Sequence, residues 1–251
     1  IVEGDSAITV AGSTRGSNAS NAINNLSTGL LTISSVNNAK LTLQSISANG
    51  DTTTGVTLNS VGSVKLLNTN VELSNVYQTQ ALYIGNSTTN SNLEVINSKL
   101  DVITNSSGAP NAIRLAGSSG NVTFTNSQVT VKMNNHTQYT SAIYMLGEFN
   151  INRSDLEINV NSDPFQMTPT IDQYTTAKYG QYSSNAANTA YTLEAGRVFN
   201  DVHTGFMGHF KATHTCLAGA VVHEAPEHPC DEYMQDVTYC VVCGVEMSRV
   251  E

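Results

Sequence analysis

A ten-residue segment recurs along the chain with fixed internal offsets, and this repeat constrains the fold more than any other feature. Each copy has two alternating apolar pairs around a central Asn, and copies begin at Val64, Leu93 and Val122. A copy from Phe149 keeps the apolar positions but has Arg in place of the Asn, and a partial copy begins at Val36. The central residues recur about every 29 positions, a period typical of solenoids. They are Asn38, Asn68, Asn97, Asn126 and Arg153.

A further alternating pair precedes each copy, which makes three short strands per repeat. These pairs are Val56 and Leu58, Leu82 and Ile84, Ile113 and Leu115, and Ile143 and Met145. A single short strand cannot bury its apolar face alone, so neighbouring coils must stack, about 4.8 Å apart. The sequence therefore predicts an all-β chain with a parallel β-helix over residues 30–160.

The central Asn falls between the second and third strands of each coil. Asn tolerates the left-handed backbone conformation that a tight bend needs, and its amide can both donate and accept a hydrogen bond. We expect the aligned Asn side chains to form a buried ladder from coil to coil. The alternative is that an Asn-rich sequence places Asn at turns by chance.

The three-strand coils and the Asn at the bend resemble the pectin-lyase-like, right-handed parallel β-helix family. The resemblance implies a right-handed helix and an association with polysaccharides. Enzymes of that class cleave by calcium-assisted β-elimination or with a pair of carboxylates, and the calcium would be needed only under the lyase alternative. Low charge and richness in Ser, Thr and Asn also resemble the repeat regions of bacterial surface proteins.

The composition limits the classes of partner that we expect the protein to bind. Asn, Ser and Thr make up about a third of the chain, charged residues are 12%, and the net charge is −9. The few basic residues are scattered, so we expect no nucleic-acid partner. No run of eighteen apolar residues occurs, so we expect no membrane insertion in this segment. The chain opens without Met or an apolar leader, which we interpret as a mature or trimmed form of a secreted or cell-surface bacterial protein.

Charged residues at outward strand positions are isolated. Glu72, Asp101 and Glu157 occupy equivalent offsets, but Thr42 and Thr130 interrupt the row. We interpret these carboxylates as solvated surface groups and expect no catalytic residues.

Aromatic residues provide the candidate ligand-binding surface. Tyr83, Arg114 and Tyr144 occupy matching outward offsets, which suits either surface packing or a flat platform for a sugar ring. Tyr174, Tyr179 and Tyr182 fall in segment 163–200, where a cap over the last coil and glycan contact are alternatives. We assign residues 1–200 to the β-helix with its caps.

All four cysteines and five of the six histidines fall in residues 201–251, which we predict to be a small separate module. Its Cys240-Val-Val-Cys243-Gly244 sequence is typical of a metal-binding knuckle. His214, Cys216 and Cys230 complete a pattern that resembles the zinc-ribbon-like modules at the ends of Gram-positive surface proteins. A 50-residue unit without Trp buries too little apolar surface to be stable alone, so it needs a bound metal ion or disulfides, which we call a staple. We expect structural zinc bound by Cys216, Cys230, Cys240 and Cys243, with His214 as the alternative first ligand and two disulfides as the alternative staple.

The leading function is therefore an extracellular, non-enzymatic surface protein for adhesion or for binding a polysaccharide or a host or cell-wall glycan. A polysaccharide lyase or other carbohydrate-active enzyme is the first alternative. An inert wall spacer is the second.

Overall fold

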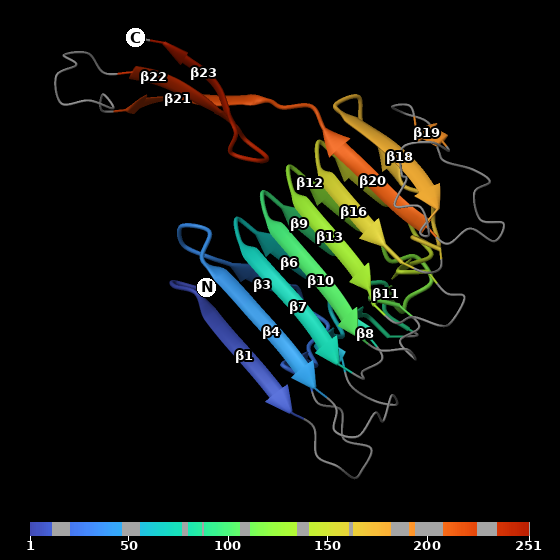
Figure 1. Ribbon diagram of the computed structural model, residues 1–251. Helices are drawn as coiled ribbons and strands as arrows, with labels where there is room; N and C mark the ends of the chain where they lie inside the picture. Colours follow the sequence, from blue (N-terminus) through green and yellow to red (C-terminus); the bar gives the residue numbers. More distant parts are fainter. Residues whose placement is uncertain are drawn as a thin grey trace.

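The computed structural model describes residues 1–11, 21–46, 56–76, 80–86, 88–105, 111–134, 141–160, 163–181, 191–193, 208–224 and 235–250, and every regular element within these ranges is a β-strand (Figure 1). The longest sheet has nine strands. In spatial order they are β1 (Ser6–Ala11), β4 (Lys40–Ile46), β7 (Asn70–Val76), β10 (Lys99–Asn105), β13 (Gln128–Met133), β16 (Asp155–Asn159), β20 (Gly208–His214), β18 (Thr175–Gln181) and β19 (Tyr191–Leu193).

Two further parallel sheets complete the coils. The five-stranded sheet runs β14 (Ile143–Tyr144), β11 (Ile113–Leu115), β8 (Gln80–Ile84), β5 (Val56–Ser60) and β2 (Ile23–Asn25). The six-stranded sheet runs β17 (Thr170–Ile171), β15 (Phe149–Asn152), β12 (Val122–Thr125), β9 (Leu93–Ile96), β6 (Val64–Leu67) and β3 (Leu31–Ser34). Successive strands of the chain visit the three sheets in turn, so the predicted parallel β-solenoid with three strands per coil is confirmed.

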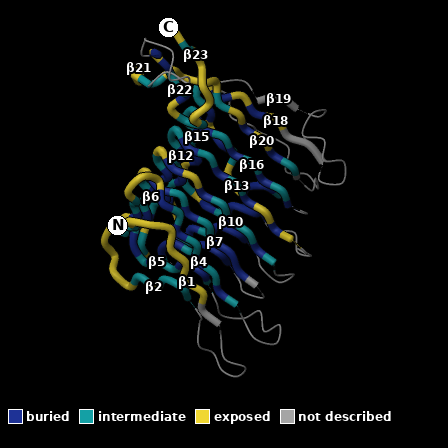
Figure 2. Tube along the Cα trace, turned by 60° about the vertical axis from the view of Figure 1, so that its left-hand side comes forward, coloured by how far each residue is buried: buried dark blue, intermediate teal, exposed yellow. Residues whose placement is uncertain are grey.

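Inward-facing apolar residues alternate with outward-facing residues along each strand, and the inward-facing residues form the core. In the nine-stranded sheet Leu73 is in register with Leu43 on one side and Val102 on the other, and all three are at most 1% exposed. The residues between them point outward and remain half-buried. Because each copy of the repeat has the same offsets, the apolar residues of successive coils align into continuous columns inside the solenoid (Figure 2).

The Asn bend has the predicted backbone conformation. Asn68, Asn97 and Asn126 have φ of 50°, 48° and 48°, and Arg153 has 45° at the equivalent place. The amide of Asn97 donates to Asn68 at 3.2 Å and accepts from Asn126 at 3.3 Å, so a ladder forms. The expectation of a buried ladder is wrong, because Asn68 and Asn97 are exposed and Asn126 is only half-buried.

A serine ladder occupies the buried position that we expected for Asn. The hydroxyl oxygen of Ser98 accepts the backbone N–H of Thr69 at 3.1 Å, Ser127 accepts that of Ser98 at 3.2 Å, and Ser154 accepts that of Ser127 at 3.0 Å. Each of these serines also donates to the carbonyl two residues earlier. Their exposure is 6% or less, so the hydroxyls satisfy backbone groups that water cannot reach.

The first coil is more complete than the partial copy suggested. Strand β3 pairs with β6 from Leu31 to Ser34, although its apolar pair lies farther from the bend than in later copies. The first bend has two consecutive residues at positive φ, Asn37 and Asn38. These additional bend residues displace β3 from the repeat offset and conceal the coil in the sequence.

Aromatic rings fill the core at the end of the last coils. Phe124, Phe149, Phe165 and Phe210 form a chain of edge-to-face contacts with centroid distances of 5.6, 6.2 and 5.1 Å, and each is at most 2% exposed. Strand β20, which carries Phe210, runs antiparallel to β16 and extends the nine-stranded sheet. These late phenylalanines therefore pack the end of the solenoid.

Beyond β20 the chain forms a separate antiparallel sheet of β21 (Ala218–Glu224), β22 (Gln235–Cys240) and β23 (Glu246–Val250), called the terminal sheet below (Figure 1). Both faces of β21 are largely exposed, whereas β22 buries Val237 and Cys240. Among the described residues the structure has no helix that could cross a membrane.

Candidate functional site

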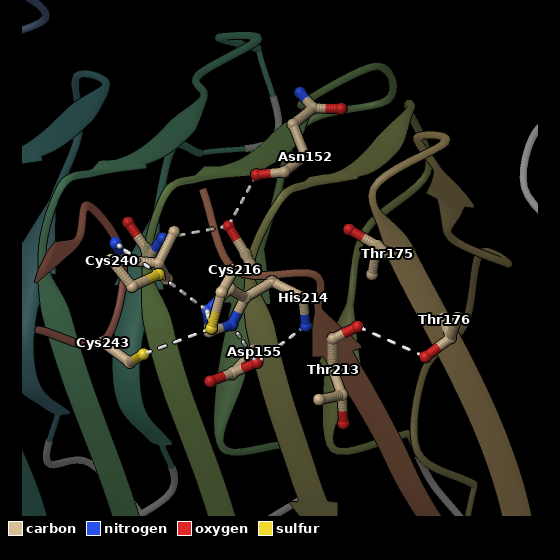
Figure 3. Close-up of polar contacts among 12 residues, drawn as sticks. Asn152, Asp155, Thr175, Thr176, Thr213, His214, Cys216, Cys240 and Cys243 are labelled. Carbon is tan, nitrogen blue, oxygen red and sulfur yellow. Dashed lines mark hydrogen bonds and ion pairs between the residues drawn. The ribbon is translucent and has the colours of Figure 1, made fainter. Parts of the chain in front are cut away.

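A cluster of four side chains joins the terminal sheet to the solenoid. His214 ends β20 and Cys216 follows it, while Cys240 ends β22 and Cys243 lies in the turn before β23 (Figure 3). Their ligand atoms all lie within 4.8 Å of one another. The cluster therefore combines residues from the nine-stranded sheet and from the terminal sheet.

The distances suit a single tetrahedral ion. The Nε2 atom of His214 lies 3.3 Å from Cys240 Sγ and 3.8 Å from Cys216 Sγ, and the sulfurs of Cys216 and Cys243 are 3.9 Å apart. Around tetrahedral zinc, neighbouring sulfurs are about 3.8 Å apart and a sulfur and a nitrogen about 3.5 Å. The cluster could therefore hold a metal ion such as zinc without a large rearrangement.

Asp155 of β16 orients the histidine. Its Oδ1 atom lies 2.6 Å from His214 Nδ1 and accepts the backbone N–H of His214 at 2.9 Å. A proton on Nδ1 leaves Nε2 free to face the sulfurs. Metal-binding histidines are commonly fixed by a carboxylate in this way, and the side chain of His214 is only 4% exposed.

The backbone between the cysteines forms a knuckle, defined as residues 240–244. Cys240 accepts the backbone N–H of Val242 on its sulfur at 3.5 Å, and the N–H of Gly244 donates to the Cys240 carbonyl at 2.9 Å. Gly244 has φ of 71°, a conformation that most side chains disfavour. The turn therefore places both cysteine sulfurs on the same side of the sheet.

The pKa values of the cluster indicate a site for a cation. Burial opposes ionisation of Cys240, but hydrogen bonds from backbone amides and from His214 outweigh burial and lower the pKa of this thiol to about 6. Hydrogen bonding to Cys240, with burial, raises the pKa of the Cys216 thiol to about 11. Burial lowers the pKa of His214, but the hydrogen bond to Asp155 raises it above its ordinary value. Neighbouring thiolates repel one another, so a divalent cation would stabilise their ionised forms.

The structure brings both alternatives for the first ligand into the same cluster, since His214 and Cys216 lie side by side with Cys240 and Cys243. The described cysteines are free thiols. Cys230 lies outside the described residues, so its place in the predicted ligand set stays a prediction. Sequence reasoning missed Asp155, which is 59 residues from His214 and has no spacing relation to the cysteines.

The predicted ligand-binding row is in register on the five-stranded sheet. Arg114 lies between Tyr83 and Tyr144 on neighbouring strands, and its guanidinium carbon is 5.1 Å from the centroid of the Tyr144 ring. All three side chains are half-buried. Sugar contact at this row stays a prediction.

Of the three tyrosines predicted in segment 163–200, the structure describes the side chain of Tyr174 alone. The ring of Tyr174 lies 3.8 Å from the guanidinium carbon of Arg153, so this tyrosine packs against the bend residue that replaces Asn. Tyr179 belongs to β18, but its side chain lies outside the described residues, as does the whole of Tyr182.

The outward carboxylates have basic neighbours. Glu72 pairs with Lys40 at 2.7 Å and Asp101 with Lys99 at 3.2 Å, while Glu157 lies 3.4 Å from His209. Glu72, Asp101 and Glu157 share a row that Thr130 interrupts, as the sequence predicted. Lys40 and Lys99 therefore neutralise Glu72 and Asp101 on the surface of the sheet.

No family model, no curated protein and no solved structure matches the chain. The resemblance to the pectin-lyase-like family is therefore supported at the level of architecture, as a β-solenoid with three parallel sheets, and no family is identified.

Proposed function

We propose that the chain is a β-solenoid scaffold whose terminal sheet is fixed by one structural zinc ion bound to His214, Cys216, Cys240 and Cys243. The observation that carries this proposal is the convergence of four ligand atoms within 4.8 Å, with Asp155 orienting the histidine. Three thiolates and one imidazole form a set that zinc prefers.

The ligand count favours a structural role for the ion. Four protein ligands fill a tetrahedral site, whereas catalytic zinc keeps one position for water or substrate. The staple joins parts of the chain that share little buried surface. On β21 even Val221 and Val222 are 53% and 45% exposed, so burial contributes little to holding this sheet in place.

Metal analysis with matched cysteine variants tests this proposal. Protein purified without added metal should contain one zinc ion per chain. Cys216→Ser should lose the ion, while Cys230→Ser, which changes the same atom at a position outside the proposed set, should keep it. Loss of zinc from Cys230→Ser would instead support the ligand set that includes Cys230. Protein without zinc and without titratable thiols would establish disulfides.

A second proposal concerns binding. The register of Tyr83, Arg114 and Tyr144 supports a non-enzymatic role in adhesion or polysaccharide binding at a bacterial cell surface. Aromatic and guanidinium faces can stack on the apolar face of a sugar ring, and the three side chains lie on successive coils of one sheet. The pairing of the outward carboxylates with basic residues favours binding over cleavage.

A glycan array combined with assays for reducing sugar and unsaturated product separates the functions. Binding without turnover, weakened by Arg114→Ala, is the expected result. Unsaturated product that requires calcium would establish a lyase. If the protein neither binds nor cleaves any glycan, the inert wall spacer is the function that remains.

A further inference from the structure

A cavity of 330 Å³ lies between the knuckle and the Asn bend of the solenoid, and we call it the bend groove. Residues 240–244 line one side. The other side includes Asn38, Asn97 and Asn126 of the bend, and Gln128 at the start of β13. Its volume is within the range of small-molecule sites, which begins at about 300 Å³.

Two polar atoms at residues lining this groove have no hydrogen-bond partner among the described residues. They are the hydroxyl oxygen of Thr69, whose residue is 1% exposed, and the side-chain oxygen of Asn70. Buried polar atoms are almost always paired, so these two atoms mark a break in the hydrogen bonding beside the groove.

The first bend explains the unpaired hydroxyl. In later coils the residue after the Asn accepts a backbone N–H from the preceding coil, as Ser98 does from Thr69. The corresponding donor for Thr69 would be Ala39, but its N–H is bonded to the carbonyl of Val36 at 3.2 Å. The irregular first bend therefore ends the serine ladder and leaves the Thr69 hydroxyl unpaired in the buried layer beside the groove.

From these features we infer that the bend groove binds one or two units of a neutral sugar chain. The carboxamides of the lining Asn and Gln residues provide both donors and acceptors, which matches the mixed hydrogen bonding of sugar hydroxyls. Val241 and Val242 of the knuckle offer aliphatic surface for the C–H face of a sugar. Lys99 is the cation among the described lining residues, and its pairing with Asp101 at 3.2 Å disfavours an anionic ligand.

The groove also links sugar binding to the metal. Cys240 and Cys243 belong both to the cluster and to the wall of the groove. A zinc ion would fix this wall against the bend without touching the sugar. Removal of zinc should therefore abolish binding in the groove while the solenoid remains folded. This inference rests on the proposed glycan binding and the proposed zinc staple.

The test uses zinc-loaded full-length chain and neutral hexasaccharides of β-1,4-linked glucose, mannose or N-acetylglucosamine, with binding followed by NMR chemical shifts. The side-chain amide signals of Asn126 and Gln128 should shift with the hexasaccharide that binds. Gln128→Ala and Asn70→Ala should each weaken this binding about tenfold. Gln44→Ala removes the same side chain from a half-buried position of the same sheet outside the groove, and it should leave the affinity unchanged.

The outcomes separate this inference from the broader proposal. Shifts confined to the row of Tyr83, Arg114 and Tyr144, with the groove signals unmoved, would overturn the groove and leave glycan binding standing. No binding to any hexasaccharide would overturn the groove, and an equally blank glycan array would overturn glycan binding itself. Full affinity after chelation, in protein shown to contain no zinc, would overturn the link to the metal.

Discussion

The solenoid and the terminal sheet are built from strands of similar length, yet they are stabilised in different ways. Leu43, Leu73 and Val102 of the solenoid are almost inaccessible, and each contacts the equivalent residue of the next coil. In the terminal sheet, Val221 and Met247 remain 53% and 42% exposed. Repetition gives every inner strand of the solenoid an apolar neighbour on both sides, whereas three strands at the end of the chain have no second layer among the described residues.

This difference shows why the cysteines occur where they do. A strand that cannot bury its side chains needs a local constraint, and a metal cluster provides one with few residues. The ligand positions also span the boundary, because His214 belongs to the long sheet and Cys240 to the terminal sheet. A metal ion bound there would thus stabilise the junction between the solenoid and the terminal sheet.

The largest expected effect comes from the solenoid core. Phe124→Ala should lower the free energy of unfolding by about 3–5 kcal/mol, because the ring is fully buried against Phe149 and leaves a cavity. Met247→Ala, in the terminal sheet, should change it by no more than about 0.5 kcal/mol. Denaturant unfolding measures both. Equal costs would mean that the two regions are stabilised alike.

The next effect concerns the carboxylate behind the metal ligand. Asp155→Asn should weaken zinc binding about 10- to 100-fold, because the charge that holds His214 Nδ1 is lost. Competition with a zinc-binding dye gives the affinity. Asp101→Asn, a change of the same kind two coils away in the same sheet, should have no effect. Identical zinc affinities for both variants would mean that Asp155 does not contribute to zinc binding.

The two ladders at the bend should differ in their contributions. Ser127→Ala should cost about 1–3 kcal/mol, because the buried N–H of Ser98 loses its partner. Asn97→Gly keeps a residue that tolerates positive φ and removes only an exposed amide, so it should cost less than about 1 kcal/mol. Thermal unfolding compares the variants. A larger loss for Asn97→Gly would assign the stabilising role to the outer ladder.

As the pH falls, zinc should be released from the cluster between the solenoid and the terminal sheet before the solenoid itself unfolds. The low pKa of Cys240, about 6, means that its thiolate contributes to stability above the ordinary thiol pKa of 9.0 and that this contribution is lost as the pH falls through about 6. The raised pKa of His214 lets protons compete for Nε2 in the same range. Zinc should therefore be released between about pH 7 and pH 5 while the solenoid keeps its strand signal by circular dichroism. Zinc retained at pH 4 would contradict this expectation.

Much of the solenoid could be predicted because its information is local and repeated. The offsets around Asn68, Asn97 and Asn126 fix which residues face inward, and aligned copies then fix the register between coils. Even the replacement by Arg153 could be placed, since its backbone adopts the same left-handed conformation. The first coil was detected only in part, because its longer bend breaks the offset.

Burial at the bend was harder to predict. Asn and a following Ser or Thr recur in three copies, as in Asn97 and Ser98, and the pattern does not say which side chain points inward. The hydrogen-bonding capacity of Asn suggested the amide, but at positive φ the Asn lies outside and the hydroxyl reaches the backbone. The hydroxyl residue that follows Asn68, Asn97, Asn126 and Arg153 was the signal that could have identified the inner ladder.

The metal cluster was predictable only in part. The short spacing of Cys240 and Cys243 identified the knuckle, and proximity in sequence suggested His214 and Cys216. Asp155 belongs to the last copy of the repeat, where it reads as an ordinary outward charge. Its role follows from the antiparallel pairing of β20 with β16, which the sequence pattern does not encode.

Hydrogen exchange before and after chelation tests most directly whether the junction depends on metal and the solenoid on burial. Zinc removal should abolish protection of backbone amides in β21, β22 and β23 and leave the inner strands β7, β10 and β13 protected as before. Unchanged protection in the terminal sheet of protein shown to be free of zinc, or loss of protection throughout the solenoid as well, would contradict the division between the two regions.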